Sequence, residues 1–216
     1  MKKAVATLLV ILLTFSLFSC KEKDREYDEE EVISAAGLLI YDSVILNEIY
    51  WGKGIDYINN ASTSNGYYYE ANVLHLEKLG FDTIDELKKK TEKVFSDSFS
   101  SIIYETTLTS VSDDDGIYSL ARYYQKYADE EMKEPEAIMV YSKAKVLLSD
   151  EVEYLYDTIT VDGAKGEIVY VTISVIVTRD QKSQTRSITV GLIEEEDGWR
   201  LNDATYISFD EGLSEN

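Results

Sequence analysis

The chain has 216 residues, of which 41 are acidic and 21 are lysine or arginine, so its formal net charge at pH 7 is −20. The resulting negative electrostatic potential repels nucleic-acid phosphates and anionic lipid head groups, which argues against nucleic-acid binding and favours a basic partner. The single cysteine, Cys20, and the single histidine, His75, exclude an intrachain disulfide and metal sites built from several thiolates or imidazoles.

The first twenty residues have the pattern of an export signal. Lys2 and Lys3 precede an apolar stretch over residues 4–18 that is short for a membrane span, and small Ser19 comes just before Cys20. This stretch resembles a bacterial lipoprotein signal. The resemblance implies removal of residues 1–19 and acylation of Cys20, for example with palmitate, on the extracytoplasmic face of the cell membrane. An ordinary signal peptide with one stray thiol and a retained membrane helix are the alternatives.

The next residues predict a tether followed by a helix. Residues 20–31 are charged after the cysteine and almost free of apolar side chains, which is typical of a solvated linker. From Val32 to Trp51 apolar residues recur at helical spacing and predict a long, largely buried helix that ends before Gly52. Its predicted apolar stripe consists of Ile33, Ala36, Ile40 and Val44, with Leu39 and Leu46 beside it. We expect one domain over residues 32–209 and an acidic tail over residues 210–216.

The middle of the chain carries two clear helix starts. Thr83 and Glu86 form a capping-box pattern, and Ser96 is placed to cap a second short helix. Residues 57–69 are rich in Asn, Ser, Gly and Tyr and predict a long loop with a short extended segment at residues 67–69. Residues 118–134 fit either a helix or irregular structure.

After Pro135 the apolar period changes from near 3.6 to 2, which predicts strands. Three long strands are expected over residues 152–161, 167–178 and 184–195, and Asp197-Gly198 predicts a hairpin into a fourth over residues 199–209. Trp199 and Leu201 should share the core face of that strand. The fold class is therefore α+β, with N-terminal helices packed on a curved, mostly antiparallel sheet of four to six strands.

Two family resemblances follow from these patterns. The order of helices before strands, with the ending DGWRLNDATY over residues 197–206, resembles the NTF2-like proteins, whose curved sheet wraps around helices as a cone. LGFDTIDELKKKTEKVFSDSF over residues 79–99, followed by the strands, is similar to exported bacterial inhibitors of DL-endopeptidase cell-wall hydrolases. The first resemblance implies an NTF2-like or cystatin-like cone, and the second implies a protein partner in the envelope. Neither supplies a catalytic motif that matches here.

The sequence predicts no cofactor, no metal site and no catalytic residue. There is no nucleophile-elbow serine and no glycine-rich phosphate loop. The run Asp113 to Asp115 before Gly116 invites a calcium site, but Val111 and Arg122 stand where an EF-hand loop needs oxygen ligands, so a solvated turn is favoured. His75, between Leu74 and Leu76, is interpreted as a packed or surface histidine.

Seventeen tyrosines are the one compositional excess, and they suit either half-buried strand faces or a recognition surface. The candidate ligand-binding residues are Tyr50, Trp51, Tyr67, Tyr68 and Tyr69, at the cone mouth that the resemblance implies. The preferred interpretation is a membrane-tethered extracytoplasmic binding module, and not an enzyme, that recognises a protein, peptide or envelope component, including a cell-wall hydrolase. The alternatives are a small NTF2-like enzyme with Asp/Tyr acid-base chemistry and a purely structural envelope component.

Overall fold

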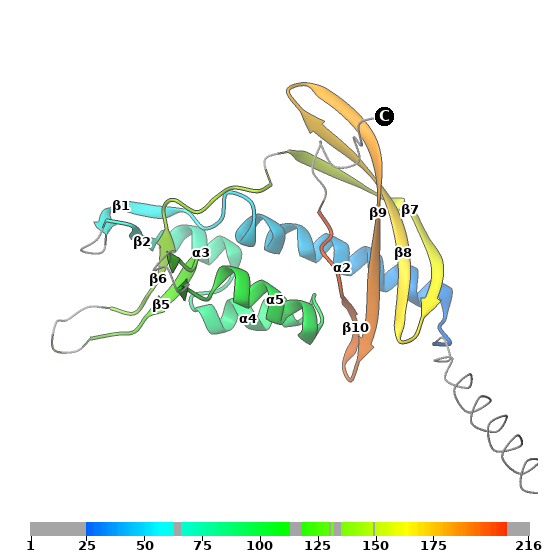
Figure 1. Cartoon of the computed structure of the whole chain (residues 1–216), viewed down its shortest axis with the longest axis horizontal. Helices are drawn as coiled ribbons and strands as arrows, with labels where there is room; N and C mark the ends of the chain where they lie inside the picture. The colour runs from blue at the N-terminus through cyan, green and yellow to red at the C-terminus, as the bar shows by residue number, and fades with distance from the viewer. Residues whose placement is uncertain are drawn as a thin grey trace, which may run out of the picture.

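The structure is a computed structural model that describes residues 25–62, 66–112, 118–129, 131, 135–148 and 150–206. It is elongated, with one antiparallel sheet at each end and helices between them (Figure 1). The elements are α2 (Glu29–Tyr50), β1 (Tyr57–Ser62), β2 (Tyr68–Ala71), α3 (Val73–Leu79), α4 (Ile84–Glu92), α5 (Asp97–Thr107), β3 (Val111–Ser112), β4 (Tyr118–Ser119), β5 (Tyr123–Lys126), β6 (Ala137–Tyr141), β7 (Glu151–Lys165), β8 (Ile168–Arg179), β9 (Lys182–Glu195) and β10 (Gly198–Leu201).

The long helix α2 begins at Glu29, before the expected start at Val32. Asp28 caps it, because its Oδ1 accepts hydrogen bonds from the backbone N–H groups of Glu30 and Glu31 at 3.0 and 3.1 Å. The three glutamates of the first turn also lie at the positive end of the helix dipole. In the predicted stripe Ala36 and Ile40 are buried, as are Leu39 and Leu46 beside it, and Ile33 is partly buried against the core. Val44 is 41% exposed, so its assignment to the core was wrong.

Arg25 anchors the start of the described chain to the body. Its backbone N–H donates to Gly166 O at 2.9 Å, its guanidinium pairs with Glu194, and it lies 5.1 Å from the centre of the Trp199 ring. Trp199 is buried, as predicted, and its Nε1 donates to Glu31 Oε1 at 3.1 Å. Arg25 and Glu31 therefore contact the body and α2 already includes residues 29–31, whereas residues 26–31 are exposed to solvent, as expected of the predicted linker. Cys20 lies outside the described residues.

Sheet B, in the order β10-β9-β8-β7, is antiparallel throughout and contains the four predicted strands. Alternate residues of β8 from Val169 to Val177 form its core face, as predicted. β7 continues through Asp162-Gly163, where a turn was expected. A β-bulge accommodates the extra residue, since the register with β8 shifts between Val161 and Gly163 and Gly163 adopts a positive φ of 133°. The β9–β10 hairpin is confirmed, with Gly198 paired to Glu195.

The last strand, β10, ends at Leu201 rather than continuing toward Phe209, which lies outside the described residues. Leu201 is paired with Leu192 of β9 and also bonds to the segment between α4 and α5, since its N–H donates to Val94 O at 2.9 Å and its carbonyl accepts from Ser96 N at 2.8 Å. The following residues cross back, with Asn202 N bound to Gly191 O at 2.8 Å. The chain after β10 is thereby directed onto α2 and β7.

Sheet A, in the order β1-β2-β6-β5, occupies the other end of the molecule. Residues 57–69 were expected to form mainly a loop, and residues 118–134 a helix or irregular structure, yet both regions contribute strands to this sheet. Their tyrosines explain the difference, because Tyr68 and Tyr123 bury their rings within the sheet and its junction with α2.

The short helices begin where their capping residues predict. Thr83 Oγ1 accepts from the N–H of Glu86 at 3.2 Å at the start of α4, and Ser96 Oγ accepts from the N–H of Phe99 at 3.2 Å at the start of α5. α3 begins after Asn72, which caps it in the same way through the N–H of Leu74. These local signals were sufficient to predict α4 and α5.

The two halves meet at the carboxyl end of α2. Arg122, just before β5, donates from Nη1 to Tyr50 O at 3.0 Å and from Nη2 to Gly52 O at 2.6 Å. The neighbouring Tyr123 hydroxyl donates to Ile49 O at 2.7 Å. The last turn of α2 has no basic residue of its own, so Arg122 supplies the positive charge that its carbonyls favour.

The fold is α+β, and α2 packs on a four-stranded antiparallel sheet, in agreement with the sequence analysis. The expectation of one sheet of four to six strands was wrong, because the strands divide into two four-stranded sheets and the short pair β3-β4. Among the described helices, α2 is also long and apolar enough to cross a membrane, but 44% of its most apolar window is buried in the fold. Packing on the fold accounts for the buried part of that composition.

Candidate functional site

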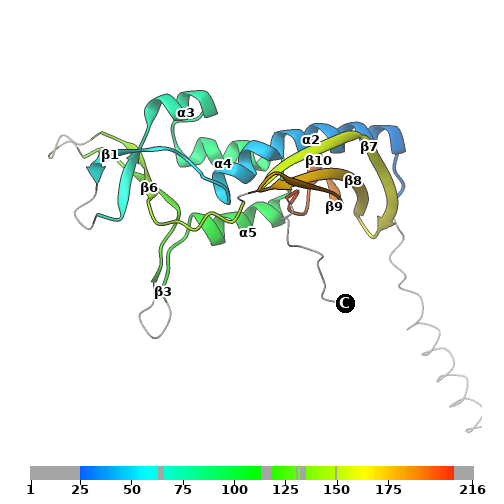
Figure 2. The same ribbon diagram turned by 90° about the horizontal axis from the view of Figure 1, so that it is seen from above.

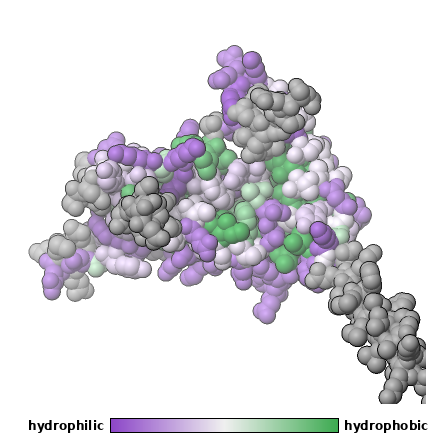
Figure 3. All heavy atoms as spheres, viewed as in Figure 1, coloured by the Kyte–Doolittle hydropathy of each residue, from purple (hydrophilic) through white to green (hydrophobic). Residues whose placement is uncertain are grey.

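The main hollow of the described surface is a groove between α2 and β7, with a volume of about 740 Å³. The two elements lie side by side in Figure 2, and hydrophobic side chains gather over the region of α2 and sheet B in Figure 3. Its walls come from α2, the segment before β7, β7 and the chain after β10. The lining residues are Tyr41, Asp42, Val44, Ile45, Asn47, Glu48, Leu147, Leu148, Asp150, Val152, Glu153, Tyr154, Tyr156 and Tyr206. We call these residues the α2–β7 groove.

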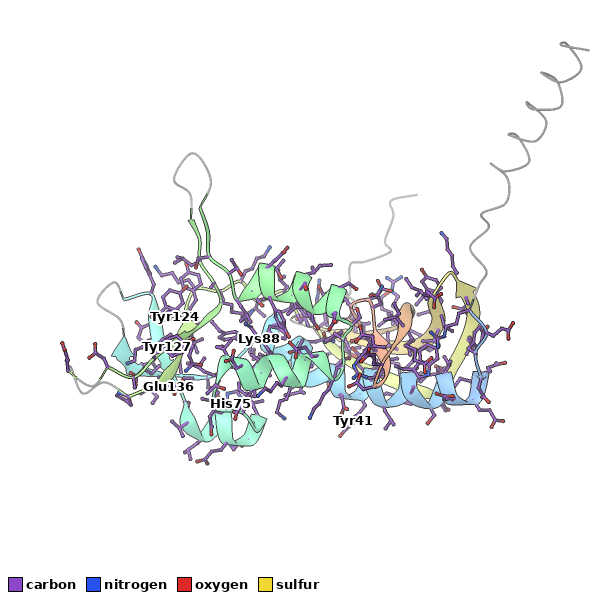
Figure 4. All side chains as sticks on the ribbon, turned by 90° about the horizontal axis from the view of Figure 1, so that it is seen from below. Tyr41, His75, Lys88, Tyr124, Tyr127 and Glu136 are labelled. Atoms are coloured by element: carbon purple, nitrogen blue, oxygen red, sulfur yellow. The ribbon has the colours of Figure 1, made fainter. Side chains whose placement is uncertain are left out.

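One wall is a second apolar face of α2. The first face is buried against the core, but Leu38, Tyr41 and Ile45 are 67%, 68% and 48% exposed and follow one another at helical spacing. Figure 4 labels Tyr41 on α2, and its ring lies 6.4 Å from that of Tyr156 on β7. A helix in a globular protein normally turns a single apolar stripe to the core, so an additional exposed stripe marks a surface that is suited to contact.

The opposite wall is the edge strand β7, which alternates Val152, Tyr154 and Tyr156 toward the groove. The rings of Tyr154 and Tyr156 stack with centroids 6.2 Å apart, and Tyr156 approaches the Tyr41 ring at 6.4 Å. Tyr154 donates its hydroxyl to Thr205 O at 2.9 Å. Burial raises the pKa of Tyr154 to about 12, so its hydroxyl stays protonated at neutral pH.

Polar side chains fix the chain end that closes the groove. Ser43 Oγ donates a hydrogen bond to Ile40 O at 2.7 Å. Its own oxygen therefore accepts a hydrogen bond from the Thr205 hydroxyl at 2.6 Å. That hydroxyl in turn accepts from Asn47 Nδ2 at 2.8 Å. The next residue, Tyr206, packs its ring against Trp51 with centroids 5.0 Å apart. The groove wall at Tyr206 therefore depends on three α2 side chains, Ser43, Asn47 and the helix-ending Trp51.

The groove continues along α2 into a smaller hollow of about 370 Å³. The two hollows share Tyr41 and Tyr156, and the second is lined further by Ile33, Ser34, Gly37, Leu38 and Ile159. From Ile33 to Glu48 the helix rises about 22 Å, which corresponds to roughly seven residues of an extended peptide. The combined surface is therefore long enough for a peptide segment.

The predicted ligand-binding residues do not form one cluster. Trp51 lies at the end of the groove, where its carbonyl also accepts from the N–H groups of Leu147 and Leu148 at 2.7 and 3.0 Å. Tyr50 is buried and its hydroxyl is bonded to Thr91 at 2.8 Å. The other three belong to the β2 end of the molecule: Tyr67 lies under Lys143, Tyr68 is buried and bonded to Ala121 O, and Tyr69 stacks on Tyr57.

The remaining sequence candidates have structural roles or are not described. His75 Nδ1 accepts from the Asp56 N–H at 2.8 Å, which ties α3 to the chain before β1. Asp113 to Asp115 lie outside the described residues. Within the described chain, no group of three or more His, Cys, Asp or Glu side chains is arranged to hold a metal ion.

A second tyrosine-containing hollow, of about 270 Å³, lies beside β5 at the other end of the molecule. Lys88, Tyr124, Tyr127 and Glu136 belong to it and are labelled in Figure 4, well separated from Tyr41. Its mixed charges and smaller size make it a poorer fit for an apolar ligand than the α2–β7 groove.

Sequence reasoning missed the principal groove residues, Tyr41, Ile45, Tyr154 and Tyr156. Two signals were readable: α2 carries more apolar residues than one buried stripe requires, and residues 152, 154 and 156 share one strand face. In comparisons of the chain with known proteins, no protein-family model, no curated protein and no solved structure matches it. The groove itself is therefore the basis for any functional proposal.

Proposed function

We propose that this chain is a membrane-tethered, extracytoplasmic binding module that holds an apolar segment of an envelope protein or peptide in the α2–β7 groove. The observation that carries the proposal is the exposed apolar face of α2 opposite the tyrosines of β7. The tether is the lipid on Cys20 that the signal resemblance implies. A binding role requires no further chemistry from the protein.

The energetics of exposure favour a ligand at this site. Soluble proteins seldom leave a contiguous apolar patch uncovered unless it serves an interaction, and a groove of this volume falls within the range of ligand sites. Covering one exposed leucine or isoleucine contributes about 1.5–3 kcal/mol to binding. Ile45 and Leu147 in the groove are 48% and 49% exposed, and Leu38 in the adjoining hollow is 67% exposed, so all three have apolar surface that a ligand could cover.

The proposal includes the two family resemblances of the sequence, to NTF2-like proteins and to inhibitors of cell-wall hydrolases. The arrangement of a long helix on a four-stranded antiparallel sheet supports a relationship of the α2–sheet B half to the NTF2-like cone. The resemblance of residues 79–99 to inhibitors of cell-wall hydrolases supports a protein of the envelope as the partner. We place that partner in the groove because the two family resemblances supply no other site.

We do not propose catalysis in the groove. Acid-base chemistry of the Asp/Tyr kind requires an available carboxyl group and an available phenol, but Tyr154 is bonded to Thr205 O and has a raised pKa. The carboxylate of Asp150 is held by Arg179, with Oδ1 2.5 Å from Nε and Oδ2 2.7 Å from Nη2. Tyr154 and Asp150 therefore hold the walls together, and no observation on the described residues brings another Tyr hydroxyl and carboxylate of the groove into contact.

The test selects ligands without assuming their identity. Random peptides displayed on phage are selected on immobilised residues 21–216, and the affinity of the selected peptides is measured for wild type and for Ile45→Ser. Loss of the isoleucine contact should weaken binding about tenfold or more. Ile102→Ser is the matched control, because Ile102 is a similarly exposed helical isoleucine on α5 outside the groove. Selected peptides that bind both variants like wild type, or failure to select any peptide, would contradict the proposal.

A further inference from the structure

We infer that the α2–β7 groove selects basic apolar segments, in which a lysine or arginine stands beside the apolar residues. The inference rests on the proposed function and adds the chemical class of the ligand. Four of the lining residues are acidic and none is Lys, Arg or His. The groove thus combines an apolar floor with charge of a single sign.

The acidic residues are not equivalent. Asp150 is neutralised by Arg179, and Glu48 Oε1 accepts the backbone N–H of Lys53 at 2.9 Å. Asp42 on α2 and Glu153 on β7 are exposed and make no ion pair within the described chain. Both residues line the groove, Asp42 from α2 and Glu153 from β7, so a cation bound there would lie in the field of two carboxylates.

Asn47 adds an unsatisfied acceptor to the wall. It is 3% exposed and lines the groove, and its Nδ2 donates to Thr205. The Ser43 hydroxyl donates to Ile40 O, so the Thr205 hydroxyl must donate to Ser43 Oγ. The Thr205 oxygen can then only accept from Asn47, which orients the amide with Nδ2 toward Thr205 and leaves Oδ1 without a donor. Oδ1 has no hydrogen-bond partner among the described residues. Because this oxygen is buried, it offers a ligand no direct contact, but it adds to the negative potential of the α2 wall.

The aromatic walls are suited to the same class of ligand. Lysine and arginine lie favourably over tyrosine faces, and Tyr41, Tyr154, Tyr156 and Tyr206 supply four rings around the groove. The net charge of −20 also draws cationic segments toward the whole molecule. A second copy of this chain, or its own acidic residues 207–216, would bring charge of the wrong sign to Asp42 and Glu153.

The experiment measures selectivity rather than binding alone. Blocked, fluorescent probe peptides share one apolar sequence and differ only in a central Lys, Gln or Glu, and their affinities for residues 21–216 are measured by anisotropy at low salt. The Lys probe should bind about fivefold more tightly than the Gln probe, and the Glu probe more weakly than both. In the double variant Asp42→Asn, Glu153→Gln the Lys-to-Gln ratio should fall to about twofold.

The matched control is the double variant Glu77→Gln, Glu105→Gln, which removes the same charge from exposed helix positions outside the groove. It should keep the wild-type ratio, and an equal fall in this control would overturn the assignment to Asp42 and Glu153. Equal binding of all three probes would overturn the inference and leave the proposed function standing, whereas no binding of any probe would count against the proposed function itself. Self-association of the wild type that the Asp42→Asn, Glu153→Gln variant lacks would assign the groove to a second copy and also overturn the inference.

Discussion

The Thr205 hydroxyl accepts a hydrogen bond from Asn47 Nδ2 at 2.8 Å, across 158 residues of sequence. It also contacts Ser43 at 2.6 Å, so one threonine fixes the chain after β10 to two positions of α2. Through the neighbouring Tyr206 this contact shapes the closed end of the α2–β7 groove.

Thr205→Val should therefore destabilise the fold although it conserves the shape of the side chain. It removes a buried hydroxyl and leaves the Asn47 amide without its acceptor, which should lower the free energy of unfolding by about 1–3 kcal/mol. Urea denaturation followed by circular dichroism measures the difference. Thr185→Val, at an exposed position of β9, is the control and should change the value by about 0.5 kcal/mol or less. Equal midpoints for the two variants would show that the Thr205 contacts contribute nothing.

Arg122→Gln should be costlier because it removes a buried cation from the end of α2. The carbonyls of Tyr50 and Gly52 would lose charged donors, and we expect a loss of about 3 kcal/mol in urea denaturation. Arg122→Lys should retain part of this stability, since it keeps the charge but not the two-pronged geometry. Lys182→Gln removes one exposed positive charge and should be nearly neutral. A nearly neutral Arg122→Gln would mean that α2 ends without help from Arg122.

The buried tyrosines predict a loss of stability at alkaline pH. Burial raises the pKa of Tyr154 from 10.0 to about 12 in the folded protein. Between these values the unfolded chain releases the proton while the folded chain retains it, so stability is intact below pH 10 and falls as pH rises toward 12. Each such group contributes a slope of about 1.4 kcal/mol per pH unit.

Urea midpoints measured across this alkaline range test the assignment. The free energy of unfolding of Tyr154→Phe should fall less steeply with pH than that of wild type, because one proton fewer is retained in the folded state. Tyr127→Phe, which removes the hydroxyl of a highly exposed tyrosine, is the matched control. Identical slopes for wild type and Tyr154→Phe would place the retained proton on another group.

Cys20→Ala should release the protein from the membrane fraction without changing its fold. The reason is that acylation at Cys20 is the proposed attachment, whereas α2 is engaged in the fold through its buried residues. Fractionation of the host cells measures the distribution, and the urea midpoint of the released protein checks that the fold is intact. Thr185→Val should stay with the membrane. Unchanged membrane association of Cys20→Ala would refute the lipid anchor.

Much of sheet B and the starts of α4 and α5 could be predicted because their signals are local. Alternating valines identify β8, and Thr83 and Ser96 lie within one helical turn of the N–H groups that they cap. Sheet A was missed because its strands are rich in Asn, Ser and Tyr, which are typical of loops as well as of half-buried strands.

The groove could be predicted only in part for a related reason. The candidate cluster included Trp51 but combined it with Tyr67 to Tyr69, which belong to the opposite sheet. The true neighbours of Trp51 are set by the return of the chain after β10 and by the packing of β7 along α2. Such contacts join residues between 51 and 158 positions apart, and a single sequence carries no local signal for them.

The contact between Arg25 and Trp199 limits the distance between the groove and a membrane surface. If Cys20 carries the lipid, four residues lie between it and Arg25, so the two Cα atoms can be at most about 18 Å apart. The turns at Gly166 and Glu194, which Arg25 contacts, would then form the foot of the molecule at the lipid surface. The smaller hollow would begin at Ile33, near this lipid-facing end, and the α2–β7 groove would continue from it. Together they would extend about 27 Å along α2 to Trp51. The acidic, tyrosine-closed end of the groove would be the part farthest from the lipids, and a partner arriving from outside the cell membrane would meet that end first.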